Sequence, residues 1–315
     1  MNVIIIGAGM SGLIAGHILQ ERGINVMLLD KGRGVGGRMA TRRMEDAVFD
    51  HGAQFLTARS DWFINVVDTW ISQGAVAPWF ATHDGGPHIR YRGVPSMNAL
   101  AKHLARGLDV RLSTTVVSIG CFDSGWNISI EDGTVLTADA CLITAPIPQA
   151  LALAKNLDLD VHPDELESLQ RLEYDPCMAV MCTLASASGL PPDGPFRPAG
   201  SSCIALVADN AAKGVSPVPC LTIHSTPEFA RMHIEEPEEA HRIMVDEAAR
   251  YIKSEIVHSV IHRWRFAQPS TQHPAPFSTL HSRPPLVLAG DAFGGARIEG
   301  AALSGLAAAD HLSTL

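Results

Sequence analysis

Three glycines near the start of the chain have the spacing of a dinucleotide-binding loop. Gly7, Gly9 and Gly12 form a G-x-G-x-x-G motif directly after the aliphatic run 3–6. In such a motif the first glycine permits a tight turn, the second lets the backbone approach a pyrophosphate, and the third lets a helix pack against a strand. The pyrophosphate would lie at the N-terminus of that helix, where free N–H groups and the helix dipole favour an anion.

An acidic residue follows at the distance that such a site requires. Asp30 lies 18 residues after Gly12, at the end of a second predicted strand over 25–29. A carboxylate at this point can hydrogen-bond the hydroxyl groups of a ribose. A G-x-G-x-x-G motif alone can be an ordinary glycine-rich turn, but this one follows a strand, precedes a helix and is followed by its acid. We therefore predict a dinucleotide-binding site.

A basic, glycine-rich loop narrows the choice of dinucleotide. The formal net charge of the chain is −9, so this loop is a local reversal of sign. It could be a solvated loop, or its backbone and guanidinium groups could surround a pyrophosphate, where arginine forms bidentate hydrogen bonds. A second loop of this kind suits FAD, whose flavin end must pass through the protein. Within 13 residues the segment holds Lys31, Arg33, Arg38, Arg42 and Arg43.

The pattern resembles the glutathione-reductase-like FAD superfamily, in particular the branch that contains the flavin amine oxidases. Members carry a G-G-R segment soon after the ribose-binding acid, matched here by residues 36–38. Their next feature is an acid-glycine segment beneath the flavin, matched by residues 49–55, FDHGAQF. The resemblance implies FAD as the cofactor. We expect it to be bound non-covalently, because no cysteine lies in these flavin-proximal motifs.

The C-terminal end of the chain carries a second part of this signature. The run 286–291 predicts a strand that ends in Gly-Asp, and 297–309 predicts a helix of small residues. By the same resemblance, Asp291 binds ribityl or phosphate oxygens, and the helix that starts near Gly300 points its N-terminus at the N1–C2=O edge of the flavin. That positive helix end would stabilise the anionic reduced flavin. An ordinary closing helix is the alternative.

Motif and resemblance together predict the residues that contact FAD. The strand predicted over 110–117 is expected to lay a backbone amide near Val117 against adenine, and 140–146 is expected to form a second nucleotide-domain strand. The predicted FAD-binding residues are Gly7, Gly9, Met10, Ser11, Gly12, Asp30, Lys31, Gly37, Arg38, Gly52, Ala53, Gln54, Val117, Ala145, Gly290, Asp291, Glu299, Gly300 and Ala301.

Length and composition limit the class of protein. A chain of 315 residues, 46% hydrophobic and 18% charged, can form one large or two ordinary globular domains. Its acidic balance argues against general nucleic-acid binding, which relies on basic faces. No apolar run reaches the ~18 residues of a membrane span. The first predicted strand leaves no room for a signal peptide, and six cysteines without a C-x-x-C pair suggest reduced thiols, so we expect a cytoplasmic enzyme.

We predict an α/β fold with a Rossmann-type FAD-binding domain, a three-layer βα sandwich, and a second α+β domain for substrate built on an antiparallel sheet. The FAD-binding domain is expected to comprise 1–58, 93–150 and 275–315, and the substrate domain 59–92 and 151–274. Periodicity and turn signals predict further elements. They are a turn at 83–87, a helix from an N-cap at Ser96 to 104, a hairpin over 126–136, strands at 177–184, 202–208, 221–224 and 256–266, and a helix at 235–253.

Three segments sharpen the resemblance to the renalase family and its bacterial members: 30–40, 221–226 and 262–269. This resemblance implies an FAD oxidase that acts on the 2- and 6-dihydro isomers of NAD(P)H, regenerates NAD(P)⁺ and releases hydrogen peroxide. The partners would be a dihydronicotinamide dinucleotide and O₂, with neither nucleic acid nor membrane involved. The preferred isomer and the choice between NAD and NADP stay open.

Hydride transfer from a dihydropyridine to flavin N5 needs stacking and alignment rather than a general base. The candidates for this work are His224, Trp264, Arg265 and Gln54. Trp264 and Arg265 are neighbours on a predicted strand, so their side chains point to opposite faces and at most one should line the pocket. Each candidate also has a plain structural alternative: a sheet histidine, a core tryptophan or a surface ion pair.

Other kinds of catalysis find little support. His258 and His262 lie four residues apart, but their segment alternates like a strand and lacks an adjacent acid, so we predict structural histidines and no metal. Two alternatives to the dihydronicotinamide oxidase stay open: a small-amine oxidase on the same scaffold, and a non-catalytic FAD-binding redox protein. The three tyrosines of the chain suggest no pair near the tail for an amine-oxidase aromatic cage.

Overall fold

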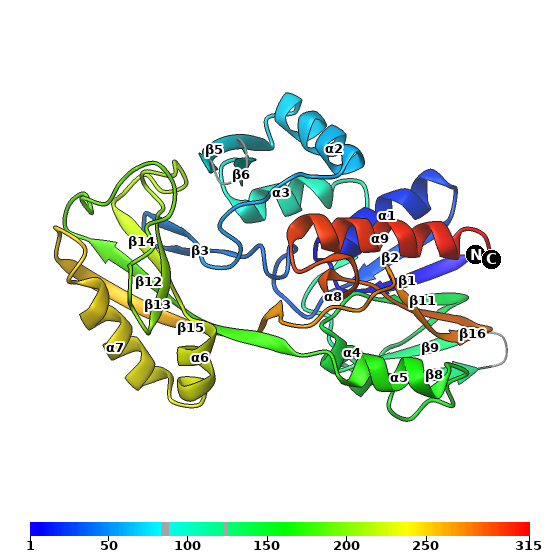
Figure 1. Cartoon of the computed structure of the whole chain (residues 1–315). Helices are drawn as coiled ribbons and strands as arrows, with labels where there is room; N and C mark the ends of the chain where they lie inside the picture. Colours follow the sequence, from blue (N-terminus) through cyan, green and yellow to red (C-terminus); the bar gives the residue numbers. More distant parts are fainter. Residues whose placement is uncertain (83–87, 123–124) are drawn as a thin grey trace. The chain divides into compact units, whose positions relative to one another are not determined.

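The computed structural model describes residues 1–82, 88–122 and 125–315 (Figure 1). The turn predicted at 83–87 lies outside the described residues. The chain divides into two compact units, each assembled from segments far apart in the sequence. Unit 1 comprises 1–37, 101–173 and 269–315, and unit 2 comprises 38–100 and 174–268.

A six-stranded sheet forms the centre of unit 1. Its order is β16-β17-β11-β1-β2-β7, and all its neighbouring pairs are parallel except β16–β17. Strand β1, in the middle of this sheet, has an almost wholly aliphatic sequence because both of its faces are covered. The strands are β1 (Asn2–Ile6), β2 (Asn25–Leu29), β7 (Asp109–Arg111), β11 (Ala140–Ile143), β16 (Ser278–Ser282) and β17 (Pro285–Leu288).

Two helices from opposite ends of the chain lie side by side in unit 1, α1 (Met10–Glu21) and α9 (Ile298–Leu312) (Figure 1). Their close approach requires Gly305, because a Cβ atom there would lie 2.2 Å from the carbonyl oxygen of Ser11. Three further helices complete the unit: α4 (Ile147–Ala154), α5 (Pro163–Gln170) and the short α8 (Asp291–Gly294).

A smaller antiparallel sheet, β10-β9-β8, contacts β1 and β11 of the large sheet. It consists of β8 (Val116–Phe122), β9 (Gly125–Ile130) and β10 (Val135–Ala138), and so contains the predicted hairpin. With the helices and the parallel sheet it makes the third layer of unit 1. The predicted three-layer fold is confirmed.

Unit 2 is built on a four-stranded sheet, β13-β14-β12-β15, whose described pairs are antiparallel. Along the central strand, Met178, Val180 and Cys182 join a core with helices α6 and α7, whereas Met181 packs with Phe49 on the other side. This alternation is the two-residue period of a strand covered on both faces. The elements are β12 (Tyr174–Leu184), β13 (Ile204–Asp209), β14 (Cys220–Ser225), β15 (Ile256–Pro269), α6 (Pro227–His233) and α7 (Pro237–Ala248).

The N-terminal part of unit 2 holds two hairpins and a helix. Helix α2 (Asp61–Ser72) is capped by Ser60, whose side chain accepts a hydrogen bond from the backbone amide of Phe63. Helix α3 (Met97–Leu104) starts directly after Ser96, as predicted, and the division between the units falls within it. The hairpins are β3 (Thr41–Met44) with β4 (Ala47–Asp50), and β5 (Val76–Thr82) with β6 (His88–Gly93).

Two predictions need correction. The single strand predicted over 110–117 is two strands, β7 and β8, in different sheets, and Ser113 between them has a φ of 52° that interrupts an extended chain. The helix predicted to reach residue 253 ends at Ala248. In the division into two units, 38–58 and 93–100 belong to unit 2, and 151–173 and 269–274 belong to unit 1, while the predicted FAD-binding and substrate domains stay predictions.

Specific contacts explain this division. The β3–β4 hairpin joins unit 2 because Asp50 binds Lys213, and because the Val48 amide donates to Ser216. Helix α5 joins unit 1 because Glu165 accepts hydrogen bonds from the side chains of Ser278 and His273. The roles of the two parts in FAD and substrate binding remain proposals.

Candidate functional site

The glycine loop of unit 1 shows which glycines the protein itself requires. Gly7 has a φ of +115°, and a Cβ on Gly12 would lie 2.0 Å from the carbonyl oxygen of Gly7. Gly9 is different, because it has an ordinary φ of −80° and a Cβ there would meet no protein atom within 4 Å. The fold therefore requires Gly7 and Gly12. The fold does not require Gly9, which leaves room for a bound group beside the start of α1.

Asp30 closes the base of this loop. Its Oδ2 accepts a hydrogen bond from the amide of Ala8 at 2.8 Å, and its Oδ1 accepts one from the amide of Gly32 at 2.7 Å. The carboxylate therefore joins the loop after β1 to the loop after β2. The segment before β8 also contacts Asp30, because the amide of Thr114 donates a hydrogen bond to the carbonyl oxygen of Asp30 at 2.8 Å. Val117, predicted to contact adenine, lies three residues further along, with its side chain 52% exposed.

Several predicted FAD residues gather at one edge of the parallel sheet. Gly7, Asp30, Ala145 and Gly290 each follow the carboxyl end of a parallel strand: β1, β2, β11 and β17. Ligands of open α/β sheets bind outside this edge. Gly290 has a φ of +151°, and its amide donates to Ser304 Oγ at 2.9 Å, which fixes the approach to Asp291.

The second glycine-rich loop folds onto the first. The amide of Gly36 donates to the carbonyl oxygen of Ala8 at 2.8 Å, and Gly36 and Gly37 have φ values of 106° and 52°. Lys31 donates to Gln149 at 3.2 Å. In unit 2, the Nη1 atom of Arg38 donates to the carbonyl oxygen of Ala267 at 3.2 Å.

The C-terminal helix starts in a tight turn. A Cβ atom on Gly300 would lie 2.1 Å from the carbonyl oxygen of Gly295, so that turn requires glycine. Helix α9 begins at Ile298, close to the predicted start, and its first turn includes the buried Glu299 together with Gly300 and Ala301.

The residues of unit 1 fit an FAD nucleotide. Ser11 Oγ is buried in the first turn of α1 and has no hydrogen-bond partner in the protein. A phosphate oxygen would supply an acceptor for this hydroxyl group, at a helix end that favours anions. Gly9 leaves room for the close approach of that group. We propose FAD contacts for the predicted residues of this unit on these grounds.

The predicted flavin segment of unit 2 is folded against residues 38–40. The amide of Ala53 donates to the carbonyl oxygen of Arg38 at 2.8 Å. Gly52 is required there, because a Cβ atom on it would lie 2.0 Å from the same oxygen. Gln54 is buried, and its Nε2 donates to the carbonyl oxygens of Asp50 and Gly52 at 2.5 and 3.2 Å.

Two of the predicted substrate residues meet at His51. Its carbonyl oxygen accepts hydrogen bonds from His224 Nε2 at 3.1 Å and from Trp264 Nε1 at 3.0 Å. The imidazole of His51 is stacked on the indole of Trp264, with ring centroids 5.3 Å apart, and His262 contacts both rings edge-on. His262, predicted to be structural, therefore packs in the same cluster. We call these four residues the His51 cluster.

The imidazoles of the His51 cluster are neutral at physiological pH. Burial lowers the pKa of His51 to about 3, with smaller contributions from His262 and His224. Burial also lowers the pKa of His224 to about 4, although its hydrogen bond to His51 acts in the opposite direction. His51 Nδ1 is buried and has no partner in the protein. The His51 cluster therefore consists of uncharged aromatic rings, and one of its nitrogens, His51 Nδ1, has no hydrogen-bond partner in the protein.

Arg265 lies apart from the His51 cluster. It follows Trp264 on β15, so its side chain leaves from the other face of the strand. There it is about half exposed and pairs with Glu235 at 2.6 Å. Of the two neighbours, Trp264 is therefore the one that joins His51, and the structure gives Arg265 the surface ion pair.

Lys213 is a buried lysine that no motif in the sequence indicates. Lys213 is fully buried and pairs with Asp50, also fully buried, at 2.8 Å. Its Nζ lies 3.4 Å from Gln54 Oε1 and 4.9 Å from the ring centroid of Trp79. The partners are 163 residues apart in the sequence, so no local pattern connects them.

Comparison with known proteins identifies the family. The family profile described as "Flavin containing amine oxidoreductase" matches residues 70–313, and that described as "NAD(P)-binding Rossmann-like domain" matches 5–70. The chain belongs to the flavin-containing amine oxidoreductase family. Membership makes it a flavin-dependent oxidoreductase, and the cofactor is FAD, as predicted.

Three known proteins resemble the chain over nearly its whole length. Renalase from Mus musculus is 23% identical, with 97% of this chain and 96% of renalase covered. Putrescine oxidase bound to putrescine superimposes with a TM-score of 0.70 at 16% identity, covering both chains completely. A CLA-producing fatty acid isomerase from P. acnes gives a TM-score of 0.69 at 14% identity, covering 99% and 97%. These two structures share the fold alone.

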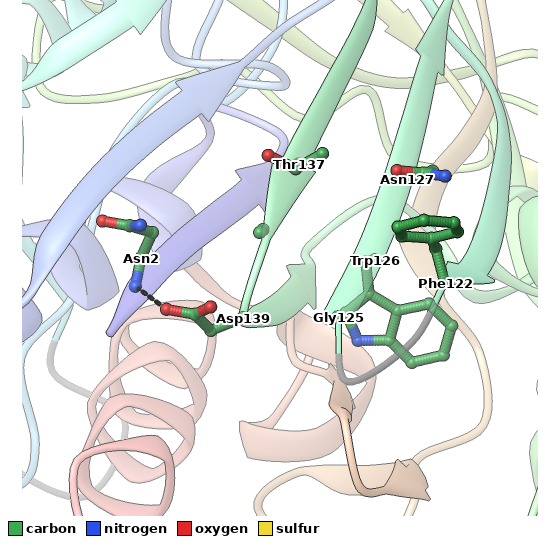
Figure 2. A pocket seen from close by; sticks show the side chains of 8 residues that line it. Asn2, Phe122, Gly125, Trp126, Asn127, Thr137 and Asp139 are labelled. Carbon is green, nitrogen blue, oxygen red and sulfur yellow. Dashed lines mark hydrogen bonds between the residues drawn. The ribbon is translucent and has the colours of Figure 1, made fainter.

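Other features of this flavin oxidoreductase stand apart from the predicted site. A cavity of about 120 Å³ lies beside Asn2, Trp126, Asn127 and Asp139 (Figure 2). It adjoins the first residue of β1, whereas Gly7 follows the last. In residues 1–82, 88–122 and 125–315, no group of His, Cys, Asp and Glu side chains could hold a metal ion. None of the described helices has the length and apolarity needed to cross a membrane.

Proposed function

We propose that this chain is a renalase-like FAD oxidase that converts the 2- and 6-dihydro isomers of NAD(P)H to NAD(P)⁺. The observation that carries the proposal is the end-to-end likeness to renalase, which leaves almost no part of either chain unmatched. The motif resemblance at 30–40, 221–226 and 262–269 supports it, because these segments contain Asp30, His224 and Trp264.

The reaction balances with O₂ as the acceptor: dihydro-NAD(P), O₂ and one proton give NAD(P)⁺ and H₂O₂. When bound, FAD supplies the redox chemistry, accepting two electrons from the substrate and passing them to O₂. The protein has to bind the dihydropyridine ring, align it and exclude competing geometries. We propose that Trp264, His224 and Gln54 do this work in unit 2, and that Arg38, Gly52, Ala53 and Gln54 contact FAD there. Arg265 stays a candidate only for a surface role.

The neutral state of the His51 cluster supports this substrate class. Substrate oxidation turns an uncharged dihydropyridine ring into a cationic pyridinium ring. Protonated imidazoles near that ring would repel the product, and the depressed pKa values of His51 and His224 prevent their protonation at pH 7. His51 Nδ1, which has no partner, offers a hydrogen bond that a nicotinamide carboxamide could complete.

An amine oxidase on the same scaffold is the second candidate, because the family as a whole carries that description. One observation weighs against it. Phe293, which lies in the tail where an aromatic cage residue could stand, is 5% exposed and packs against His273, with ring centroids 5.3 Å apart. It is therefore a core residue.

Product analysis tests the proposal. The FAD-loaded enzyme is incubated in air with purified 2- or 6-dihydro-NAD, and NAD⁺ and H₂O₂ are quantified. We expect one NAD⁺ and one H₂O₂ for each substrate molecule consumed, and none from putrescine or benzylamine. Peroxide formation from an amine, with none from either isomer, would assign the chain to the amine oxidases.

A further inference from the structure

Unit 2 contains a second cluster, centred on Lys213, which is charged and which the proposed reaction does not use. The carboxylate of Asp50 is its negative charge. Oδ1 of Asp50 accepts from Thr41 Oγ1 at 2.6 Å and from the amide of Met97 at 3.0 Å, while Oδ2 accepts from Lys213. Both oxygens of this carboxylate therefore have hydrogen-bond partners, and the positive charge of Lys213 balances its negative charge.

Arg92 adds a second positive charge to the same neighbourhood. The positive charge of Arg92 acts on Lys213: the pKa of Lys213 is lowered chiefly by burial, Asp50 opposes that shift, and Arg92 adds to it. The guanidinium lies directly against Gly214, where a Cβ atom would be 3.3 Å from Nη2. Two positive charges therefore lie near each other, and the carboxylate of Asp50 pairs with the positive charge of Lys213.

One nitrogen of the Arg92 guanidinium lacks a hydrogen-bond partner within the protein. This atom, Nη1, is buried and forms no hydrogen bond, although the residue as a whole is only partly buried. A buried N–H donor without an acceptor is costly, so such groups are hydrogen-bonded in folded proteins. Among the described residues, no acceptor contacts this nitrogen.

A second donor in this cluster is unsatisfied as well. Trp79, whose ring lies 4.9 Å from Lys213 Nζ, has a buried Nε1 with no partner. Trp79 lies on β5 and Arg92 on β6, where Arg92 pairs with Ala77, two residues before Trp79. Arginine and tryptophan nitrogens only donate hydrogen bonds. The group that satisfies them must therefore be an acceptor, and the excess positive charge favours an anion.

We propose that Arg92, Lys213 and Trp79 form a binding site for an oxyanion, of the phosphate or carboxylate class, on a small ligand. The planar guanidinium can bind two oxygens of such a group, Trp79 can donate to one of them, and Lys213 supplies long-range attraction. This site goes beyond the proposed oxidation and does not depend on it, since its test uses simple anions.

The test measures the melting temperature of the FAD-loaded enzyme in sodium phosphate, sodium acetate and sodium chloride at equal ionic strength. Wild type is compared with Arg92→Met and with Arg250→Met. Arg250 is an exposed residue paired with Glu247 on the surface of unit 2, so both variants lose one positive charge. General salting effects of phosphate act on all three proteins alike.

We expect a saturable stabilisation of wild type by phosphate or acetate, with an apparent Kd that rises about tenfold or more in Arg92→Met and is unchanged in Arg250→Met. The stronger anion shows which of the two classes the site prefers. In chloride alone, Arg92→Met should melt no lower than wild type, because it removes a buried donor that has no partner within the protein.

Two results would overturn the proposal. One is an equal response of wild type and Arg92→Met to both anions. The other is a lower melting temperature for Arg92→Met in chloride, which would show that the guanidinium is satisfied within the protein. Arg92→Lys keeps the charge without the two-nitrogen fork, and we expect an affinity between those of wild type and Arg92→Met.

Discussion

The Nε2 atom of His224 lies 3.1 Å from the carbonyl oxygen of His51. Because a carbonyl oxygen can only accept, this nitrogen carries the hydrogen, which fixes the tautomer of His224. Trp264 Nε1 donates to the same oxygen. Strands β14 and β15 thus both fix one peptide group of the segment that follows β4. The position of that segment, with Gly52 and Gln54, depends on these two donors.

Removal of one donor should loosen this segment without unfolding the unit. For His224→Leu we expect a loss of about 0.5–1.5 kcal/mol in the free energy of unfolding, because Trp264 still satisfies the oxygen. We also expect slower flavin reduction by substrate. His224→Gln, whose amide can donate, should recover most of the stability. Urea unfolding of the three proteins measures this, and equal losses for Leu and Gln would show that the hydrogen bond is irrelevant.

The buried histidines should make stability depend on pH. The folded pKa values of His51 and His224, about 3 and 4, lie below the ordinary value of 6.5. Below pH 6.5 the unfolded chain therefore binds protons that the folded protein does not, and stability falls as the pH drops from 6.5 towards 4. Above pH 6.5 this contribution is fully present. Each histidine contributes a slope of about 1.4 kcal/mol per pH unit within that window.

A comparison of two proteins isolates this effect from that of the carboxylates. His224→Gln cannot titrate at position 224, so its unfolding free energy should fall less steeply between pH 6 and pH 4.5 than that of wild type, by about one histidine slope. Parallel curves for the two proteins would mean that His224 is protonated as readily in the folded state as in the unfolded chain.

Substitution of Gly9 should affect FAD alone. A Cβ atom at Gly9 meets no protein atom, so the apoprotein of Gly9→Ala should unfold at nearly the wild-type urea concentration. Its FAD dissociation constant should rise about tenfold or more, because the methyl group occupies the approach of the pyrophosphate. Gly12→Ala is the contrasting variant: its Cβ would collide with the Gly7 carbonyl, so it should lose apoprotein stability as well. Unchanged FAD affinity in Gly9→Ala would place the pyrophosphate elsewhere.

Asp291 should contribute to FAD retention. Its side chain is 8% exposed at the start of α8, directly after the carboxyl edge of β17. Asp291→Ala should cost about 1–3 kcal/mol of FAD binding, because it removes a charged acceptor from buried hydroxyl groups. Asp310→Ala, which removes an exposed carboxylate paired with Arg22 on the surface of α9, is the control. Fluorescence titration of both apoproteins with FAD gives the two affinities, and equal values would remove Asp291 from the site.

Local patterns predicted the parts of the fold whose causes are local. The aliphatic run 3–6, the glycine motif and Asp30 form one strand–turn–helix–strand unit, so their spacing carries the information. The strand predicted over 110–117 was wrong because the left-handed backbone of Ser113 has no strong signal in a run of β-branched residues. Alternation along β15 placed Trp264 and Arg265 on opposite faces, but which of them joins His51 depends on how the strand packs.

Long-range pairs explain what the sequence could not show. Lys213 and Asp50 are brought together by the packing of β4 against the β13–β14 region, and neither residue belongs to a motif that names the other. The same holds for the position of Arg92 against Gly214. Two charged residues that lie far apart in the sequence can be recognised as a buried pair only once the fold is known.

The central claim is that 2- and 6-dihydro isomers of NAD(P)H are the substrates. Its most direct test is stopped-flow absorbance of the FAD-loaded enzyme, mixed under nitrogen with one equivalent of 2- or 6-dihydro-NAD(P), of 4-dihydro-NADH, or of putrescine. The account predicts rapid bleaching of the flavin by an isomer, recovery of the colour in air, and far slower bleaching by 4-dihydro-NADH, whose hydride is misaligned. Putrescine should leave the flavin oxidised. Rapid bleaching by putrescine, with none by either isomer, would contradict it.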